Sequence, residues 1–223
     1  MKKFLIYFFV SIIILFSSLI VFLSFYGYQT DRFNKIIQSE INNSKKGINL
    51  EFDEISILLD IKNLTLFVKF INPEVQYNST KIPLEVLRAN ISILSLIKNE
   101  ISIKNVNAET KFFEIDLIKN YVSQIKIDKI YKNYIKEIDT SKIKLKSGFS
   151  LDNAFLVKDF TLSGIVKDTN IGSNTKHKLS NLNFNFLYKN EIIKINNLSA
   201  KFDYINIKKG KIDIFNKKGT TNL

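Results

Sequence analysis

Apolar and polar residues alternate with a period of two through most of the chain from Ile48 onward. Successive side chains of a strand point to opposite faces of a sheet, so this period predicts strands with one apolar and one wetted face. Such faces are typical of antiparallel sheets. The clearest sets are Leu64, Leu66, Val68 and Phe70; Leu87, Ala89, Ile91 and Ile93; Ile143, Leu145, Ser147, Phe149 and Leu151; and Leu182, Phe184, Phe186 and Tyr188. We therefore expect a mainly β fold.

The N-terminal segment has a different pattern, an apolar run without any charged residue from Phe4 to Tyr28. As a helix, this run is longer than the roughly 30 Å thickness of a bilayer's hydrocarbon core. Aromatic residues lie near both of its ends, as they do at membrane interfaces. A cleaved signal peptide has a shorter core and small residues at the cleavage site, whereas this run ends in bulky residues. We expect an uncleaved transmembrane helix with its N-terminus inside, because long domains translocate largely regardless of charge.

Two further segments have helical spacing. The first has apolar residues at Phe33, Ile36, Ile37 and Ile41, and the second extends from Ile118 to Ile138. The last expected strand ends at Ile214, and the chain stops at Leu223 without a closing element, which leaves room for a longer natural chain. The expected organisation is an anchor in 1–30, an amphipathic helix in 31–47, a first β region in 48–117, an amphipathic helix in 118–140, and a second, possibly incomplete, β region in 141–223.

The charge of the chain is strongly basic but dispersed. The 33 Lys and Arg against 21 Asp and Glu give a formal net charge of +12. Such an excess favours nucleic acid or anionic lipid headgroups. Nucleic-acid binding needs basic residues interleaved with aromatics on one face, and Lys208 and Lys209 near Tyr204 do not form such a pattern. We expect a membrane partner and no nucleic acid.

Residues that carry catalysis are scarce. The absence of Cys excludes a Cys nucleophile and a thiolate zinc site, and the single histidine, His177, lies in a polar, loop-like run. The acidic residues have neither the spacing of a metal cage nor that of a carboxylate pair. These residues are Asp53, Glu54, Glu114, Asp116, Asp152 and Asp159. The sequence predicts no enzyme, no catalytic residues, no metal site and no cofactor.

The order of elements in the first 120 residues resembles the N-terminus of the AsmA-like proteins, the group that includes AsmA, TamB and YhdP. An anchor precedes a short helix in 31–45. A strand pair, 48–52 and 64–70, leads to the turn Asn72-Pro73. A strand ending in 92–101 and the strand 103–109 follow, and 158–166 is similar to the family's repeated strands. Members of this family are usually much longer.

The resemblance implies a fold and a function. It implies an antiparallel, strongly curved sheet rolled into a groove, anchored in the bacterial inner membrane with its bulk in the periplasm. It also implies a role in phospholipid transport to the outer membrane or in the maintenance of that membrane, with other envelope proteins as further partners. Two alternatives stay open: a lipopolysaccharide bridge component similar to LptC, which is closer in length, and a structural or adaptor β-sandwich without cargo.

A groove of this kind needs no specific chemistry, since burial of each acyl CH₂ contributes roughly 0.8 kcal/mol. The expected lipid-binding residues share one alternating face of the predicted strands. They are Leu64, Leu66, Val68, Phe70, Leu87, Ile91, Ile93, Phe184 and Phe186.

Overall fold

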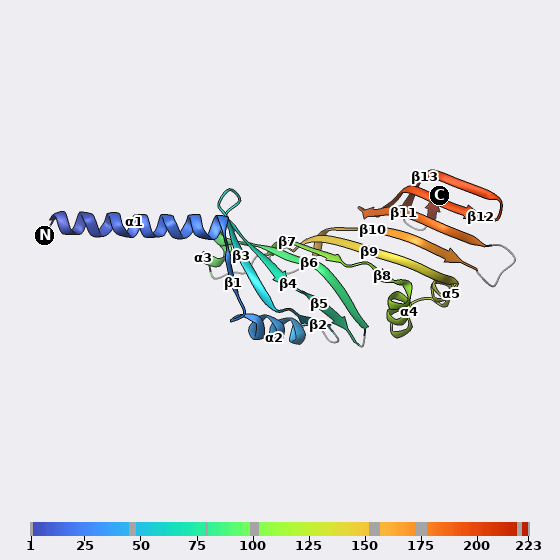
Figure 1. The fold of residues 1–223 in the computed structure, drawn as a ribbon, viewed down its shortest axis with the longest axis horizontal. Coiled ribbons are helices and arrows are strands. Elements are labelled where there is room, and N and C mark those ends of the chain that lie inside the picture. Colours follow the sequence, from blue (N-terminus) through green and yellow to red (C-terminus); the bar gives the residue numbers. More distant parts are fainter. Residues whose placement is uncertain are drawn as a thin grey trace.

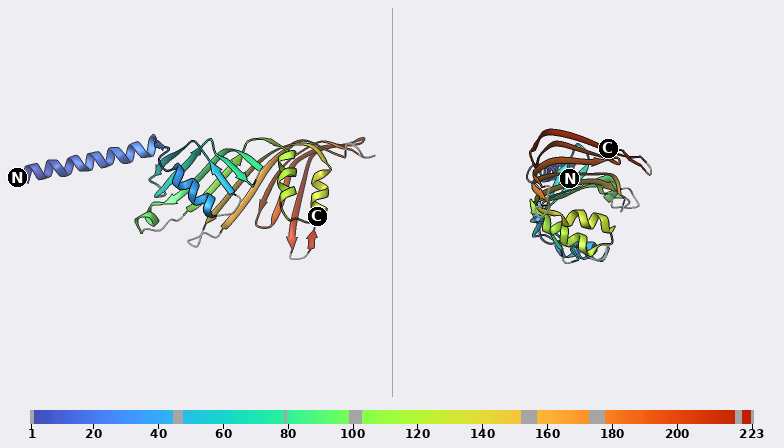
Figure 2. Two further views of the ribbon diagram at one scale, coloured as in Figure 1. Left: turned by 90° about the horizontal axis from the view of Figure 1, so that it is seen from below. Right: turned by 90° about the vertical axis from the view of Figure 1, so that its right-hand side faces the viewer.

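The structure of the chain is a computed structural model. It describes residues 2–44, 48–78, 80–98, 103–151, 157–172, 178–217 and 220–222. Helix α1 projects from one end of an elongated β domain (Figures 1 and 2). The other helices are short and lie beside the sheet. The helices are α1 (Lys2–Phe25), α2 (Asn34–Ser44), α3 (Ile93–Ile97), α4 (Ile115–Gln124) and α5 (Lys129–Lys136).

The strands belong to one antiparallel sheet, which confirms the predicted mainly β class. Its main path is β1-β3-β4-β6-β7-β9-β10-β11-β12-β13-β14; β2 and β5 form a ribbon on β6, and β8 pairs with β9. The sheet is twisted rather than strongly curled (Figure 2). The strands are β1 (Tyr28–Thr30), β2 (Ile48–Glu51), β3 (Glu54–Asp60), β4 (Thr65–Ile71), β5 (Glu74–Tyr77), β6 (Thr80–Ser92), β7 (Ile103–Thr110), β8 (Phe113–Glu114), β9 (Ile138–Leu151), β10 (Val157–Ile171), β11 (Leu179–Lys189), β12 (Ile192–Phe202), β13 (Ile205–Lys217) and β14 (Thr220–Asn222).

The pairing of the first strands differs from the sequence prediction. The expected pair of 48–52 with 64–70 does not form, because β2 pairs with β5 and β4 pairs with β3. The sequence prediction missed β3, in which Leu58 interrupts the alternation of Ile55, Ile57 and Leu59 with polar residues. Pairing of β7 with β9 joins the two β regions into one sheet.

The helix expected in 118–140 is two helices, α4 and α5. The backbone is extended at Ile125 and Asp128, between them. The apolar spacing explains the break, since Ile118 and Val122 follow one helical series and Tyr131 and Tyr134 follow another. One continuous helix would point these two series in different directions. In the structure, Val122 of α4 is buried and α5 has no buried residue.

Helix α1 is long and apolar enough to cross a membrane, by length and composition. Two of the four serines inside it are satisfied locally, since the hydroxyls of Ser18 and Ser24 donate to the carbonyls of Leu15 and Ile20. That arrangement removes the cost of free hydroxyls in a hydrocarbon environment.

The junction between α1 and the sheet is short, because only Tyr26 and Gly27 separate α1 from β1. Gly27 has a φ of +72°, and a Cβ at this position would lie 3.0 Å from the carbonyl oxygen of Ile57 in β3. Glycine is therefore required there both by conformation and by close packing. The start of the sheet is held directly against the end of α1.

Candidate functional site

One cross-strand row extends across almost the whole sheet. Each neighbour in this row is a register partner of the next residue, so all of its side chains share one face of the sheet. Eight of the nine members are apolar. The row is Ile55, Phe70, Leu87, Ala108, Ser147, Leu162, Tyr188, Ile193 and Ile214. The apolar face is therefore continuous from β3 to β13.

The N-terminal part of this face is covered by the chain itself. Ile55 and Val68, with 2% and 7% of their surfaces exposed, pack with Leu50 of β2 and with Phe52 in one core. Ile37 of α2 and Val75 of β5 pack against the same core, so α2 and the β2–β5 ribbon form its cover. We call this part the closed face; its residues on the sheet are Ile55, Ile57, Val68, Phe70, Leu87 and Ile91.

A second, smaller core covers the N-terminal part of β9. Phe113 of β8 and Ile115 of α4 pack with Ile143, and Leu117 and Leu145 lie against them. Helices α4 and α5 lie beside this end of β9 (Figure 1). Their packing partners are β9, β6 and β8.

Beyond β9, the same face has no cover among the residues that the structure describes. Neither core includes a residue of β10–β14. Val166 and Ala200 are buried there, but the other apolar side chains that continue the row of the closed face are half-buried or exposed. We call this part the open face; its residues are Leu162, Phe184, Phe186, Tyr188, Ile193, Ile195, Ile212 and Ile214.

The centre of the open face is shaped by Phe186 and Gly164. These two residues are register partners on β11 and β10, and a Cβ on Gly164 would lie 2.7 Å from Cζ of Phe186. The missing side chain of Gly164 thus leaves the space in which the Phe186 ring lies. Phe184 lies beside Phe186, with 6.4 Å between the ring centroids. Two aromatic rings therefore lie side by side at this part of the surface.

Bulges occur on each strand of this region. Asp168, Asn181, Asn197 and Lys209 have positive φ, and each lies at a register shift, on β10, β11, β12 and β13 respectively. An extra residue in one strand bends that strand and increases its twist. Asn183 fixes the first of these bulges, since its side-chain oxygen accepts the backbone N–H of Asp168 at 3.0 Å. The open face is thus built from bent strands.

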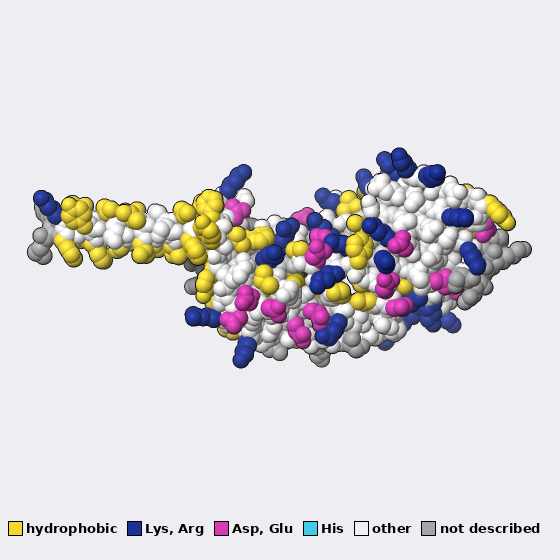
Figure 3. Space-filling model, in the orientation of Figure 1, with side chains coloured by type: hydrophobic (Ala, Val, Ile, Leu, Met, Phe, Trp, Pro, Cys, Tyr) yellow, Lys and Arg dark blue, Asp and Glu magenta, His cyan; other side chains and the backbone are white. Residues whose placement is uncertain are grey.

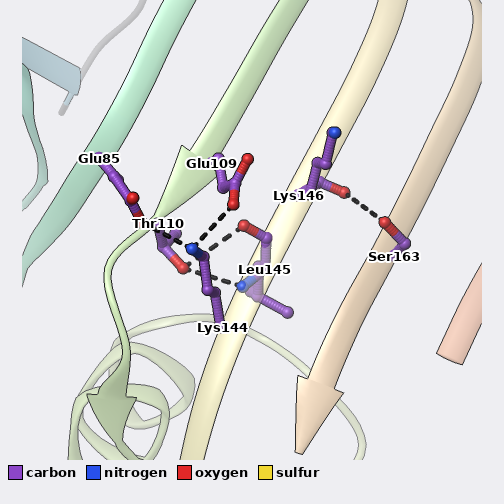
Figure 4. A network of polar contacts seen from close by, with 7 residues as sticks. All are labelled: Glu85, Glu109, Thr110, Lys144, Leu145, Lys146 and Ser163. Atoms are coloured by element: carbon purple, nitrogen blue, oxygen red, sulfur yellow. Dashed lines mark hydrogen bonds and ion pairs between the residues drawn. The ribbon is translucent and has the colours of Figure 1, made fainter. Parts of the chain in front are cut away.

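The opposite face of the sheet is polar and contains an ion-pair cluster (Figure 4). Nζ of Lys144 lies 2.6 Å from Oε2 of Glu85 and 2.8 Å from Oε1 of Glu109. The hydrogen bond from Lys144 lowers the pKa of Glu109, and the hydrogen bonds to Glu109 and Glu85 raise the pKa of Lys144. The cluster joins β6, β7 and β9, so its role in the structure is to hold neighbouring strands together.

The predicted groove residues fall into three places. Val68, Phe70, Leu87 and Ile91 belong to the closed face, and Leu66 pairs with Ile91 on the same side. Phe184 and Phe186 belong to the open face. Leu64 and Ile93 are not strand residues: Leu64 precedes β4 with a φ of +49°, and Ile93 begins α3. The sequence analysis thus assigned to one lipid groove residues that lie in different surroundings in the structure.

The sequence reasoning missed several open-face residues on β10, β12 and β13. Ile193 with Ile195 and Ile212 with Ile214 show the same period of two, so the signal was present. The alternating pattern of β12 is obscured because the bulge at Asn197 shifts the apolar positions by one residue. Ile193 and Ile195 precede the bulge, and Leu198 and Ala200 follow it.

The candidate polar sites add nothing to this picture. His177 and Asp152 lie outside the described residues. Among the described residues, no group of three or more His, Asp or Glu side chains lies close enough to hold a metal ion. Comparisons with family models, curated proteins and solved structures found no match to this chain.

Proposed function

We propose that this chain is a membrane-anchored lipid-binding protein in which the open face binds acyl chains. The observation that carries the proposal is the contrast along one cross-strand row, which is packed from β3 to β6 and, among the described residues, lacks a cover from β10 to β13. An exposed apolar surface larger than a few hundred Å² marks a binding site in a soluble domain. Hydrocarbon is the occupant that an uncharged surface of Ile, Leu and Phe suits best.

Helix α1 supports a proposal about the location of the protein. We propose that α1 spans the bacterial inner membrane and that the β domain lies in the periplasm, where it moves phospholipid towards the outer membrane or maintains that membrane. A membrane at one end of the domain would supply lipid to an apolar face that continues along the sheet. The bulges on β10–β13 support a further bending of these strands around the lipid, into the curved groove that the resemblance to AsmA-like proteins implies.

Photo-crosslinking tests the proposal with the full chain. A benzophenone amino acid would replace Phe184 on the open face or, as the matched control, Leu187, which is 39% exposed on the polar face three residues away. The variants would be reconstituted in vesicles of phosphatidylethanolamine and phosphatidylglycerol that contain ³²P-labelled lipid. We expect labelled protein from the Phe184 position and little from the Leu187 position. Equal labelling at both positions would contradict a lipid site on the open face.

Charged substitutions sharpen this test. Phe184→Asp should reduce lipid labelling by a probe at Tyr188, and Leu187→Asp should not. Asn183 is unsuitable as a neutral control, because it holds the bulge at Asp168. If Phe184→Asp changes neither labelling nor stability, the adaptor function without cargo would be favoured instead.

A further inference from the structure

The end of the β domain nearest α1 has its own exposed apolar surface. Ile61 and Leu64, in the turn between β3 and β4, are 52% and 46% exposed, and Leu94 of α3 is 55% exposed. Lys62 and Lys98 are exposed within the same two segments. We call this surface the tip patch; it consists of Ile61, Lys62, Leu64, Leu94 and Lys98.

The two segments of the tip patch are joined and ordered. The backbone N–H of Ile93 donates to the carbonyl oxygen of Leu64 at 3.0 Å. The Asp60 carboxylate accepts both the backbone N–H and the side-chain amide of Asn63, at 3.1 and 2.7 Å, which lowers the pKa of Asp60. Polar contacts therefore order the turn, and its apolar side chains Ile61 and Leu64 are exposed at the surface.

The tip patch lies at the end of the sheet from which α1 leaves. In Figure 1 the β3–β4 turn and α3 lie at the end of the domain from which α1 projects, and in Figure 3 apolar side chains gather along α1 and around its junction with the domain. The register agrees, because β1 pairs with Ile55–Ile57 and α1 continues from β1 towards the turn end of β3. Two residues, Tyr26 and Gly27, span at most about 7 Å. If α1 crosses a membrane, this end of the domain lies at the membrane surface.

We infer that the tip patch docks into the headgroup region of the same bilayer that α1 spans. The occupant follows from continuity with α1 and from charge, since apolar side chains flanked by lysines match a surface that is apolar below and anionic above. Docking would fix the tilt of the domain and hold the start of the closed face at the lipid surface. The inference rests on the proposed membrane anchoring by α1.

Single-cysteine labelling tests the inference, because the natural chain has no Cys. The full chain would carry an environment-sensitive fluorophore at Ser17→Cys in α1, at Leu64→Cys or Leu94→Cys in the tip patch, or at Tyr204→Cys. Tyr204 is 100% exposed in the β12–β13 turn, far from α1 (Figure 1). Vesicles of phosphatidylcholine and phosphatidylglycerol would contain lipids with a spin label at the headgroup or deep in the acyl chain.

We expect headgroup spin labels to quench the probes at Leu64→Cys and Leu94→Cys, and deep labels to quench Ser17→Cys. Tyr204→Cys should not be quenched. Probes at both tip positions that behave like Tyr204→Cys, while Ser17→Cys is quenched, would overturn the docking inference and leave the anchor intact. A Ser17→Cys probe that is not quenched would overturn the anchor, and with it the docking. Lys62→Glu combined with Lys98→Glu should weaken tip quenching several-fold, whereas Lys208→Glu combined with Lys211→Glu should not.

Discussion

The closed and open faces are parts of one sheet surface, but among the described residues only the closed face is covered by other segments of the chain. Both are built from alternating apolar residues, and the row from Ile55 to Ile214 joins them without interruption. The closed face gains its cover from α2 and the β2–β5 ribbon, which are separate segments of the chain. No described segment covers the apolar side of β10–β13 in this way. Alternation therefore determines which side of a strand is apolar, whereas other segments of the chain determine whether that side becomes core.

The largest expected effect compares one isoleucine from each face. Ile55→Ala removes a side chain that is 2% exposed, so we expect a loss of about 2–5 kcal/mol in the free energy of unfolding. Ile195→Ala, on the half-buried open face, should cost about 1 kcal/mol or less, since that side chain leaves a smaller cavity. Denaturant unfolding of both variants in detergent micelles, followed by far-UV circular dichroism, measures the difference. Equal losses would show that the open face is as tightly packed as the closed face.

The sequence was sufficient to predict the closed face's strands but not its cover. Leu66, Val68 and Phe70 alternate clearly, and Leu87 and Ile91 complete their surface in the observed register. The β2–β5 pairing could not be predicted, because both strands are four residues long and their partners are set by the β5–β6 hairpin. Short strands contribute too few apolar contacts to specify a partner from pattern alone.

A second prediction concerns the packing at the centre of the open face. Gly164→Ala should displace the Phe186 ring and cost about 1–3 kcal/mol, because the added Cβ overlaps that ring. When Phe186 is already replaced by Ala, the Gly164→Ala substitution should cost much less, because the ring that its Cβ overlaps is absent. This coupling is measurable as a double-mutant cycle in thermal or denaturant unfolding. Additive effects of the two substitutions would contradict the packing of this ring on Gly164.

A third prediction tests the polar face that both regions share. Lys144→Met leaves Glu85 and Glu109 without their common cation and should cost about 1 kcal/mol, whereas exposed Lys142→Met should cost little. The contribution of Glu109, whose pKa is lowered, is complete above its ordinary value of 4.5 and is lost as the pH falls through the lowered value. The contribution of Lys144, whose pKa is raised, is complete below 10.5 and is lost as the pH rises through the raised value.

The measurement for this cluster is the unfolding free energy of the natural chain and of Lys144→Met as a function of pH. The two curves should be furthest apart between about pH 5 and 10 and converge outside that window. A constant separation at all pH values would show that Lys144 stabilises the sheet by packing rather than by charge.

The smallest expected effect distinguishes the bent strands of the open face from regular strands. Lys209→Gly replaces a residue with a φ of +56° by one that adopts this conformation freely, and should stabilise the chain by about 0.5–1 kcal/mol. Lys211→Gly, two residues away in the same strand, should destabilise by a similar amount. A loss of stability in both variants would argue against the bulge at Lys209.

The bulges also mark the limit of sequence reasoning at the candidate site. Phe184 and Phe186 were found because they lie between the bulges of β11 and β12, where the alternation is intact. The bulges at Asp168 and Asn197 each add one residue to the strand. Apolar residues that occupy odd positions on one side of a bulge therefore occupy even positions on the other side, and a search for one unbroken alternation fails there. Asn and Asp inside otherwise apolar strands are the signal that could have located these shifts, since both tolerate positive φ better than other residues.

A photoactivatable phospholipid tests the contrast between the faces most directly, because it requires no substitution. The natural chain would be reconstituted in vesicles containing a phosphatidylcholine with a diazirine in its acyl chain, irradiated, and digested for mass spectrometry. We predict lipid adducts on residues of β10–β13, in addition to α1 and the tip patch, and none on Ile55 and Val68 of the closed face, with each adduct assigned to a residue by fragmentation. Adducts confined to α1 and the tip patch, or spread equally over both faces, would contradict the account.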